Sequence, residues 1–101
     1  MNQIERIEYM EKILDESTEA ANKLFDALEE YANLSDKYHE LIDYYSSDLW
    51  LRDLDSDESG NLPESLKRGV LSEDAVYDLL TKNHLLTVKM LELVTNNIKK
   101  N

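Results

Sequence analysis

No glycine or proline interrupts the first 59 residues, and apolar side chains recur along them at helical spacing. Successive apolar positions alternate between steps of three and four residues, which is the repeat of a helix that packs along its whole length. The repeat continues for more than five heptads, broken by Ser17 and Ser35, and predicts a supercoiled helix over about residues 4–45. One seam of the repeat holds Ile7, Leu14, Ala21, Leu28 and Ile42, and the other holds Met10, Leu24, Tyr31, Tyr38 and Tyr45.

This long run contains one candidate break. Asn33 suits the end of a helix, Ser35 suits the N-cap of a new one, and Asp36 would then lie in its first turn. The heptad phase continues across these residues, so a continuous helix stays an alternative. We favour a break or a bend.

A second capping signal, Ser46-Ser47 followed by Asp48, precedes a short apolar face. Trp50, Leu51 and Leu54 share that face, which predicts a short helix over about residues 48–57. A loop-like stretch, residues 55–71, comes next and contains the only proline and both glycines. Within it we expect Pro63 to open one helical turn that Gly69 closes.

The last helix begins at a third capping signal. Ser72 suits the N-cap, with Glu73 and Asp74 in the first turn, and Leu71 and Val76 are spaced as a hydrophobic staple around it. We predict a helix over about residues 73–97, with Lys99 and Lys100 complementing its C-terminal dipole. Its apolar positions are Val76, Leu79, Leu80, Leu86, Met90, Leu93 and Val94.

Composition narrows the fold class. Two glycines and one proline among 101 residues argue against a β-sandwich or barrel, whose turns need more of both. We therefore predict one all-α domain over residues 1–101. Its expected form is an elongated antiparallel helical hairpin or small helical bundle, with coiled-coil-like packing and a short Trp-bearing helix across it.

Charge and helix length constrain the partners. A net charge of −11 repels nucleic acids and anionic membranes, so we expect neither as a partner. A helix over residues 4–45 would be about 60 Å long and the last helix only about 38 Å. The uncovered apolar stripe must meet the Trp50 helix, a bend of its own helix, or a second copy of the chain. We expect a homodimer or an unidentified protein partner.

Several classes of function find no support in the sequence. The first residues carry no basic cluster followed by an apolar run, which predicts a cytoplasmic protein. No phosphate-binding, nucleophile-elbow or zinc-protease motif is present, and there is no cysteine. We expect no enzyme activity, no catalytic residue and no cofactor.

Five residues are candidates for an interaction surface: Tyr38, Tyr45, Trp50, Lys67 and Arg68. Tyrosine and tryptophan supply contact area at small entropic cost, and the basic pair would bind an anion beside the Ser72 helix start. The alternatives are a core seam for the tyrosines, a packed cap of the hairpin for Trp50, and simple charge compensation for the basic pair. We favour these structural interpretations.

The acidic stretch 53–64 resembles an incomplete calcium loop. Counted from Asp55, its first eight positions fit the pattern, but position twelve is Leu66 instead of glutamate. Counted from Asp53, Glu64 falls at position twelve, but Glu58 replaces the turn glycine. We favour a solvated acidic linker and expect no metal; weak calcium binding is the alternative, through Asp55, Asp57, Ser59, Asn61 and Glu64.

Four segments together resemble a known family of short bacterial proteins. They are Arg6-Ile7-x-x-Met10-Glu11, Tyr44-Tyr45-Ser46-Ser47, Trp50-Leu51-x-Asp53 and, most specifically, residues 66–80. The chain resembles domain-of-unknown-function family 4298 over roughly residues 4–95. The resemblance implies a small cytoplasmic bacterial helical protein and brings no activity, cofactor or catalytic residue with it.

Overall fold

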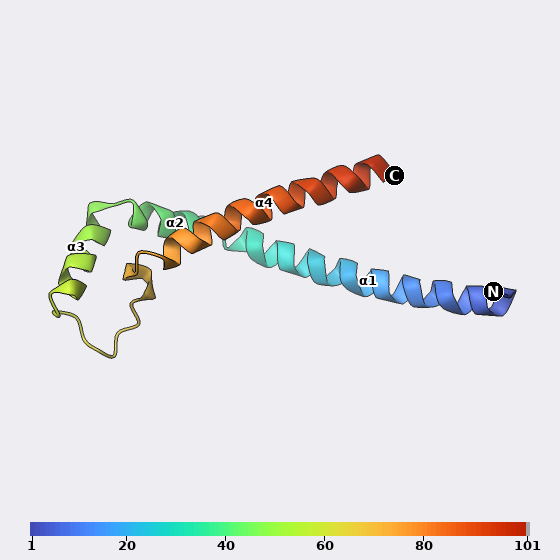
Figure 1. Ribbon diagram of the computed structural model, residues 1–101, viewed down its shortest axis with the longest axis horizontal. Helices are drawn as coiled ribbons and strands as arrows, with labels where there is room; N and C mark the ends of the chain where they lie inside the picture. The colour runs from blue at the N-terminus through green and yellow to red at the C-terminus, as the bar shows by residue number, and fades with distance from the viewer. Residues whose placement is uncertain (101) are drawn as a thin grey trace. The chain divides into compact units, whose positions relative to one another are not determined.

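The computed structural model describes residues 1–100, and every regular element in that range is helical (Figure 1). The all-α prediction is confirmed. The chain divides into two compact units, Met1–Glu40 and Leu41–Asn101. The pairing of the two long helices stays a prediction. The elements are α1 (Gln3–Asn33), α2 (Ser35–Tyr45), α3 (Asp48–Glu58), the 3₁₀ helix η1 (Gly69–Leu71) and α4 (Ala75–Lys100).

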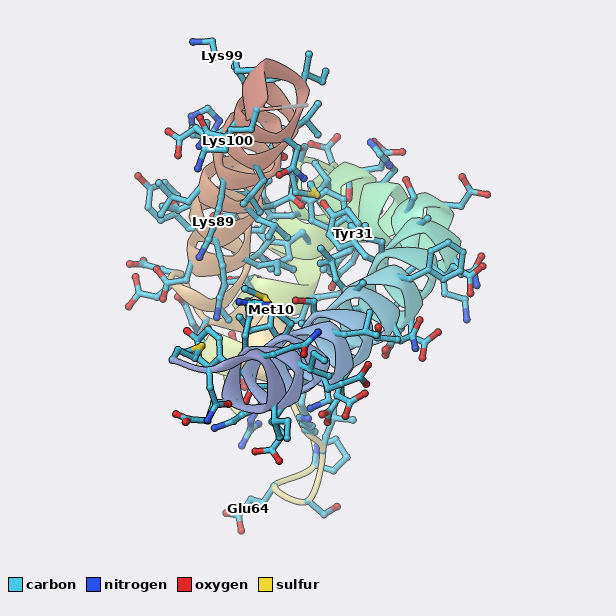
Figure 2. All side chains as sticks on the ribbon, turned by 90° about the vertical axis from the view of Figure 1, so that its right-hand side faces the viewer. Met10, Tyr31, Glu64, Lys89, Lys99 and Lys100 are labelled. Carbon is cyan, nitrogen blue, oxygen red and sulfur yellow. The ribbon has the colours of Figure 1, made fainter. Side chains whose placement is uncertain are left out.

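The first unit consists of α1 and the start of α2. Asn2 caps α1, because its side-chain oxygen accepts a hydrogen bond from the Glu5 amide at 2.8 Å. No residue of α1 is buried, although its apolar side chains follow the predicted stripe. Figure 2 shows Met10 and Tyr31 on one side of this helix. The stripe is therefore regular along α1 and uncovered.

The predicted break between the first two helices is confirmed, and it is one residue long. Leu34 lies between them with φ −90° and ψ −2°. Its amide bonds to both the Glu30 and the Tyr31 carbonyls at 3.2 Å, and its carbonyl accepts from the Tyr38 amide at 2.8 Å. Ser35 is the first residue of α2 instead of its cap, because the backbone ladder continues through Leu34.

The second unit contains the short Trp-bearing helix, which the sequence predicts over nearly the same residues. Ser47 caps α3: its hydroxyl accepts from the Trp50 amide at 3.4 Å and donates to the Tyr44 carbonyl at 2.6 Å. The predicted start of the loop at residue 55, however, is wrong. Residues 55–58 are the last turn of α3 and not the beginning of the loop-like stretch 55–71.

A Schellman motif explains this later end of α3. Gly60 has φ +73°, and its amide bonds to the Asp57 carbonyl at 3.1 Å. The Asn61 amide reaches back to the Ser56 carbonyl at 2.9 Å, which completes the two bonds of the motif. Only at Gly60 does the chain leave the helix, because glycine takes a positive φ without a Cβ clash.

Between α3 and α4 the chain makes two short turns. The Leu66 amide bonds to the Pro63 carbonyl at 3.1 Å, so the turn expected at Pro63 is present. Gly69 does not close that turn but opens η1, in which the Leu71 amide bonds to the Arg68 carbonyl at 3.0 Å. The prediction was wrong here because 3₁₀ turns are too short to show a periodic pattern.

The Ser72 cap before α4 is present, but the predicted helix start at residue 73 is wrong: α4 begins at Ala75, and Glu73 and Asp74 form a turn ahead of it. The Ser72 hydroxyl accepts from the Ala75 amide at 3.2 Å and donates to the Gly69 carbonyl at 2.7 Å. The two residues of the predicted staple, Leu71 and Val76, are 6% and 3% exposed and are the buried hydrophobic residues among residues 1–100. They form the small centre of this unit.

The long C-terminal helix ends close to the predicted position. It continues to Lys100, three residues beyond the expected end, and Lys99 and Lys100 lie in its last turn (Figure 2). Within residues 1–100, no helix is at once long and apolar enough to pass through a lipid bilayer.

The Schellman motif predicts different outcomes for the two glycines. Gly60→Ala places a Cβ at φ +73° and should lower the free energy of unfolding by about 1–2 kcal/mol. Gly69→Ala is the matched control: its φ is not in the left-handed region and its Cβ would meet open space, so stability should hold or rise by up to about 1 kcal/mol. Urea unfolding of both variants measures this, and equal losses would contradict it.

Candidate functional site

Side chains from the end of α2 and from α3, together with a backbone carbonyl of η1, form a connected group around Trp50 in the second unit. We call this group, Tyr44, Tyr45, Trp50, Asp53 and Val70, the Trp50 cluster. The Trp50 indole Nε1 donates to the Val70 carbonyl at 2.9 Å, across twenty residues of sequence. The Tyr45 ring meets the indole edge-on, with centroids 5.0 Å apart and planes at 69°. The indole thus has both an aromatic contact and a satisfied hydrogen-bond donor.

Tyr44 and Asp53 form the polar side of the cluster. The Tyr44 hydroxyl donates to Asp53 Oδ2 at 2.5 Å. This bond to a carboxylate, followed by burial and by the negative charge of Asp53, raises the pKa of Tyr44 to about 12. The phenol therefore stays protonated at neutral pH and holds Asp53 in place instead of transferring a proton.

A half-buried ion pair closes the segment after α3 onto that helix. Arg68 Nη1 lies 2.9 Å from Asp57 Oδ1, and the two side chains are 33% and 26% exposed. The pair joins residues eleven positions apart, so it fixes the segment before η1 against the last turn of α3. Partial burial protects it from screening better than the exposed Lys23–Glu19 pair on α1.

A pocket of about 280 Å³ opens beside the cluster. This is just below the usual range for small-molecule sites, which begins at about 300 Å³. Lys67 is exposed on its rim, and no carboxylate within residues 1–100 pairs with it. The pocket is lined by Tyr44, Asp53, Leu62, Leu66, Lys67, Arg68, Val70 and Leu71.

The structure brings some of the predicted interaction residues together. Tyr45 and Trp50 are in edge-to-face contact, and Lys67 and Arg68 both line the pocket, although Arg68 is also paired with Asp57. Tyr38 lies in the first unit, half-buried, with its ring edge-on to His39 at 5.6 Å.

The candidate calcium ligands do not converge. Asp55 and Asp57 lie on a helix, and Asp57 is engaged by Arg68. Glu64 projects outward from the tip of the loop (Figure 2). Within residues 1–100, no three acidic, histidine or cysteine side chains form a group suited to a metal ion. Ser59 and Asn61 use their backbone amides to end α3, bonding to the Asp55 and Ser56 carbonyls.

Tyr44, Asp53 and Val70 are not among the site residues predicted from the sequence. Asp53 is nine residues from its tyrosine partner, and Val70 is twenty residues from the indole that it binds. Neither separation is a helical period, so no pattern in the sequence connects these residues.

A model of one protein family matches residues 7–93 and is described as a domain of unknown function, DUF4298. The match covers the Trp50 cluster and most of α1 and α4. No curated protein and no solved structure matches the chain.

The bond between Tyr44 and Asp53 predicts a pH-dependent stability. The pKa of Tyr44 is raised from 10.0 to about 12. The contribution of this hydrogen bond to the free energy of unfolding is therefore full below about pH 10 and is lost as the pH rises through about 12. Tyr44→Phe should lower the free energy of unfolding by about 1 kcal/mol at neutral pH, and the difference should shrink toward pH 12. Unfolding curves at several pH values test this. The ultraviolet titration of the variant should also lack the tyrosinate step near pH 12; an unchanged titration would contradict it.

The scattered acidic side chains predict only a weak response to calcium. A true site held at 100 times its dissociation constant would add about 2.7 kcal/mol of stability. We expect thermal melts in chelator and in millimolar calcium to differ by about a few degrees, with magnesium acting equally through screening of the −11 charge. A rise of about 10 °C or more that is selective for calcium and abolished by Asp57→Ala would establish a site.

Proposed function

Because the chain belongs to the DUF4298 family, whose description assigns no function, we propose one from its own surface. We propose that it is a non-enzymatic protein-interaction module of the bacterial cytoplasm, built of helices, which self-associates. The interacting element is the apolar stripe of α1.

The uncovered stripe of α1 carries this proposal. Leu14, Leu24 and Leu28 are 57%, 52% and 42% exposed, and no side chain of this 31-residue helix is buried. A contiguous apolar face of this length on a soluble chain is typical of an interaction site. Burying one leucine contributes about 1.5–3 kcal/mol, so a row of them supplies ample free energy for association.

The Trp50 cluster supports a structural role over a catalytic one. Its pocket is small, and its hydroxyl and carboxylate are hydrogen-bonded to each other. Acid–base catalysis works best when the pKa lies near the working pH, and the pKa of Tyr44, at about 12, lies far above it. We assign the cluster the task of holding η1 and the start of α4.

The acidic side chains of residues 53–64 do not support calcium binding as a second function. It would require Asp55, Asp57 and Glu64 to converge, whereas Asp57 is paired with Arg68 and Glu64 projects away from the loop (Figure 2). No contact of these residues favours a bound cation over the ion pair.

Self-association is tested by sedimentation at micromolar concentration. We expect the native chain to form a dimer or a larger assembly. Leu24→Glu should weaken it at least about tenfold, because burying one leucine contributes about 1.5–3 kcal/mol and about 1.4 kcal/mol corresponds to a factor of ten in the dissociation constant. Asn22→Glu is the matched control. Asn22 lies about 200° around the helix axis from Leu24, away from the apolar stripe, so this substitution should leave association unchanged.

Two results would overturn the proposal. A native chain that stays monomeric across the micromolar range has no self-association to explain. Equal weakening by both variants would place the contact outside the stripe. Far-ultraviolet circular dichroism of each variant shows whether its helix content is retained.

A further inference from the structure

The apolar stripe of α1 is wider than a two-helix contact needs. A two-stranded coiled coil uses two positions in seven, a and d, whereas a helix in a bundle uses three. With Ile7 at position a, the a, d and g positions from Ile7 to Tyr31 number eleven, and Ser17 is the only one that is not apolar or aromatic. These positions are Ile7, Met10, Ile13, Leu14, Ser17, Ala20, Ala21, Leu24, Ala27, Leu28 and Tyr31.

The C-terminal helix shows the same three-row pattern. Its g positions are Leu79, Leu86 and Leu93, which are all exposed, beside the a and d rows. Its a positions are Leu80, Thr87 and Val94, and its d positions are Val76, Asn83 and Met90, so Asn83 and Thr87 are the two polar residues of the three rows. Both long helices therefore carry a face broad enough for two helical neighbours.

A hairpin alone supplies one neighbour to each of these helices. If α1 pairs with α4 of its own chain, as the sequence predicts, one row of each helix stays in water. The hairpin of a second copy of the chain gives each helix a second neighbour, because that copy carries the same two apolar faces. The helix lengths are compatible: α1 spans about 46 Å and α4 about 39 Å.

Charge decides which helix of the second copy faces which. The nine acidic and three basic residues of α1 give it a net charge of −6, and the two acidic and four basic residues of α4 give +2. Two α1 helices side by side would set −6 against −6, whereas α1 beside α4 sets opposite charges together.

Side-chain size favours the same pairing. The g row of α1 is small at Ala20 and Ala27, whereas the g row of α4 is leucine throughout. Large residues facing small ones fill the space between two helices, and two facing alanine rows leave it underfilled.

We infer that two copies of the chain form a four-helix bundle in which α1 of each copy packs against α4 of the other. The inference rests on the proposed self-association and adds its geometry. The partner of the proposed interaction module is thus a second copy of the chain, which covers the g row of each long helix.

Single cysteines test this geometry on the full-length protein, since the chain has no cysteine of its own. One set replaces Ile13, Ala20 or Ala27 in α1, and a second set, on a chain of distinguishable mass, replaces Leu79, Leu86 or Leu93 in α4. A disulfide requires Cα atoms within about 7 Å, so only direct neighbours join. Pairing inside one chain gives no product, because each chain has one thiol.

We expect mixed α1–α4 disulfides to exceed both same-helix products in at least one combination from the two sets. Asn22→Cys and Thr81→Cys, at b positions on the far side of each helix, are the matched controls and should give only random products. Variants are compared only where circular dichroism shows native helix content, and the alanine positions provide mild substitutions if the leucine ones unfold.

The contrary outcomes are separable. If α1–α1 disulfides dominate and mixed ones do not exceed the controls, the geometry is wrong while self-association stands. If stripe positions cross-link no better than the controls but the chain sediments as a dimer, the geometry is again wrong. If the chain is also monomeric, both the geometry and the proposed function fail.

Discussion

The hydrogen bond from the Trp50 indole to the Val70 carbonyl is the contact on which the second unit depends. It closes a segment of twenty residues, and closing such a segment carries an entropic penalty that a few local turns do not offset. Once Val70 is held, Leu71 and Val76 can be buried on either side of the Ser72 cap. The loop is therefore held by polar contacts in addition to this small core of two buried residues.

Those polar contacts also reduce the repulsion between the negative charges of this unit. A chain with a net charge of −11 repels itself wherever it folds back, and α3 ends in an acidic turn against its own dipole. Arg68 neutralises Asp57 at that turn, and the Tyr44 hydroxyl satisfies Asp53 one turn earlier. Within residues 1–100, no buried side-chain nitrogen or oxygen lacks a hydrogen-bond partner.

Local features of this fold could be predicted from the sequence, and long-range ones could not. The break at Leu34, the Ser47 and Ser72 caps and the Leu71–Val76 staple are properties of neighbouring residues, and each is present. The bonds of Trp50 to Val70 and of Asp57 to Arg68 join residues that no helical period relates. The misplaced start of the loop has the same origin: an acidic run resembles a linker until Gly60 and Arg68 show that it ends a helix.

The two units satisfy their apolar residues in different ways. The second unit buries Leu71 and Val76 through contacts that the chain makes with itself. The 31 residues of α1 have caps, helical propensity and a few exposed ion pairs, but each such pair contributes at most about 1 kcal/mol. In most proteins a helix owes its stability to the packing of its apolar face, and α1 buries no residue of that face. On the proposed self-association, a second copy would supply this packing, and association and the stability of α1 would then be two aspects of one free energy.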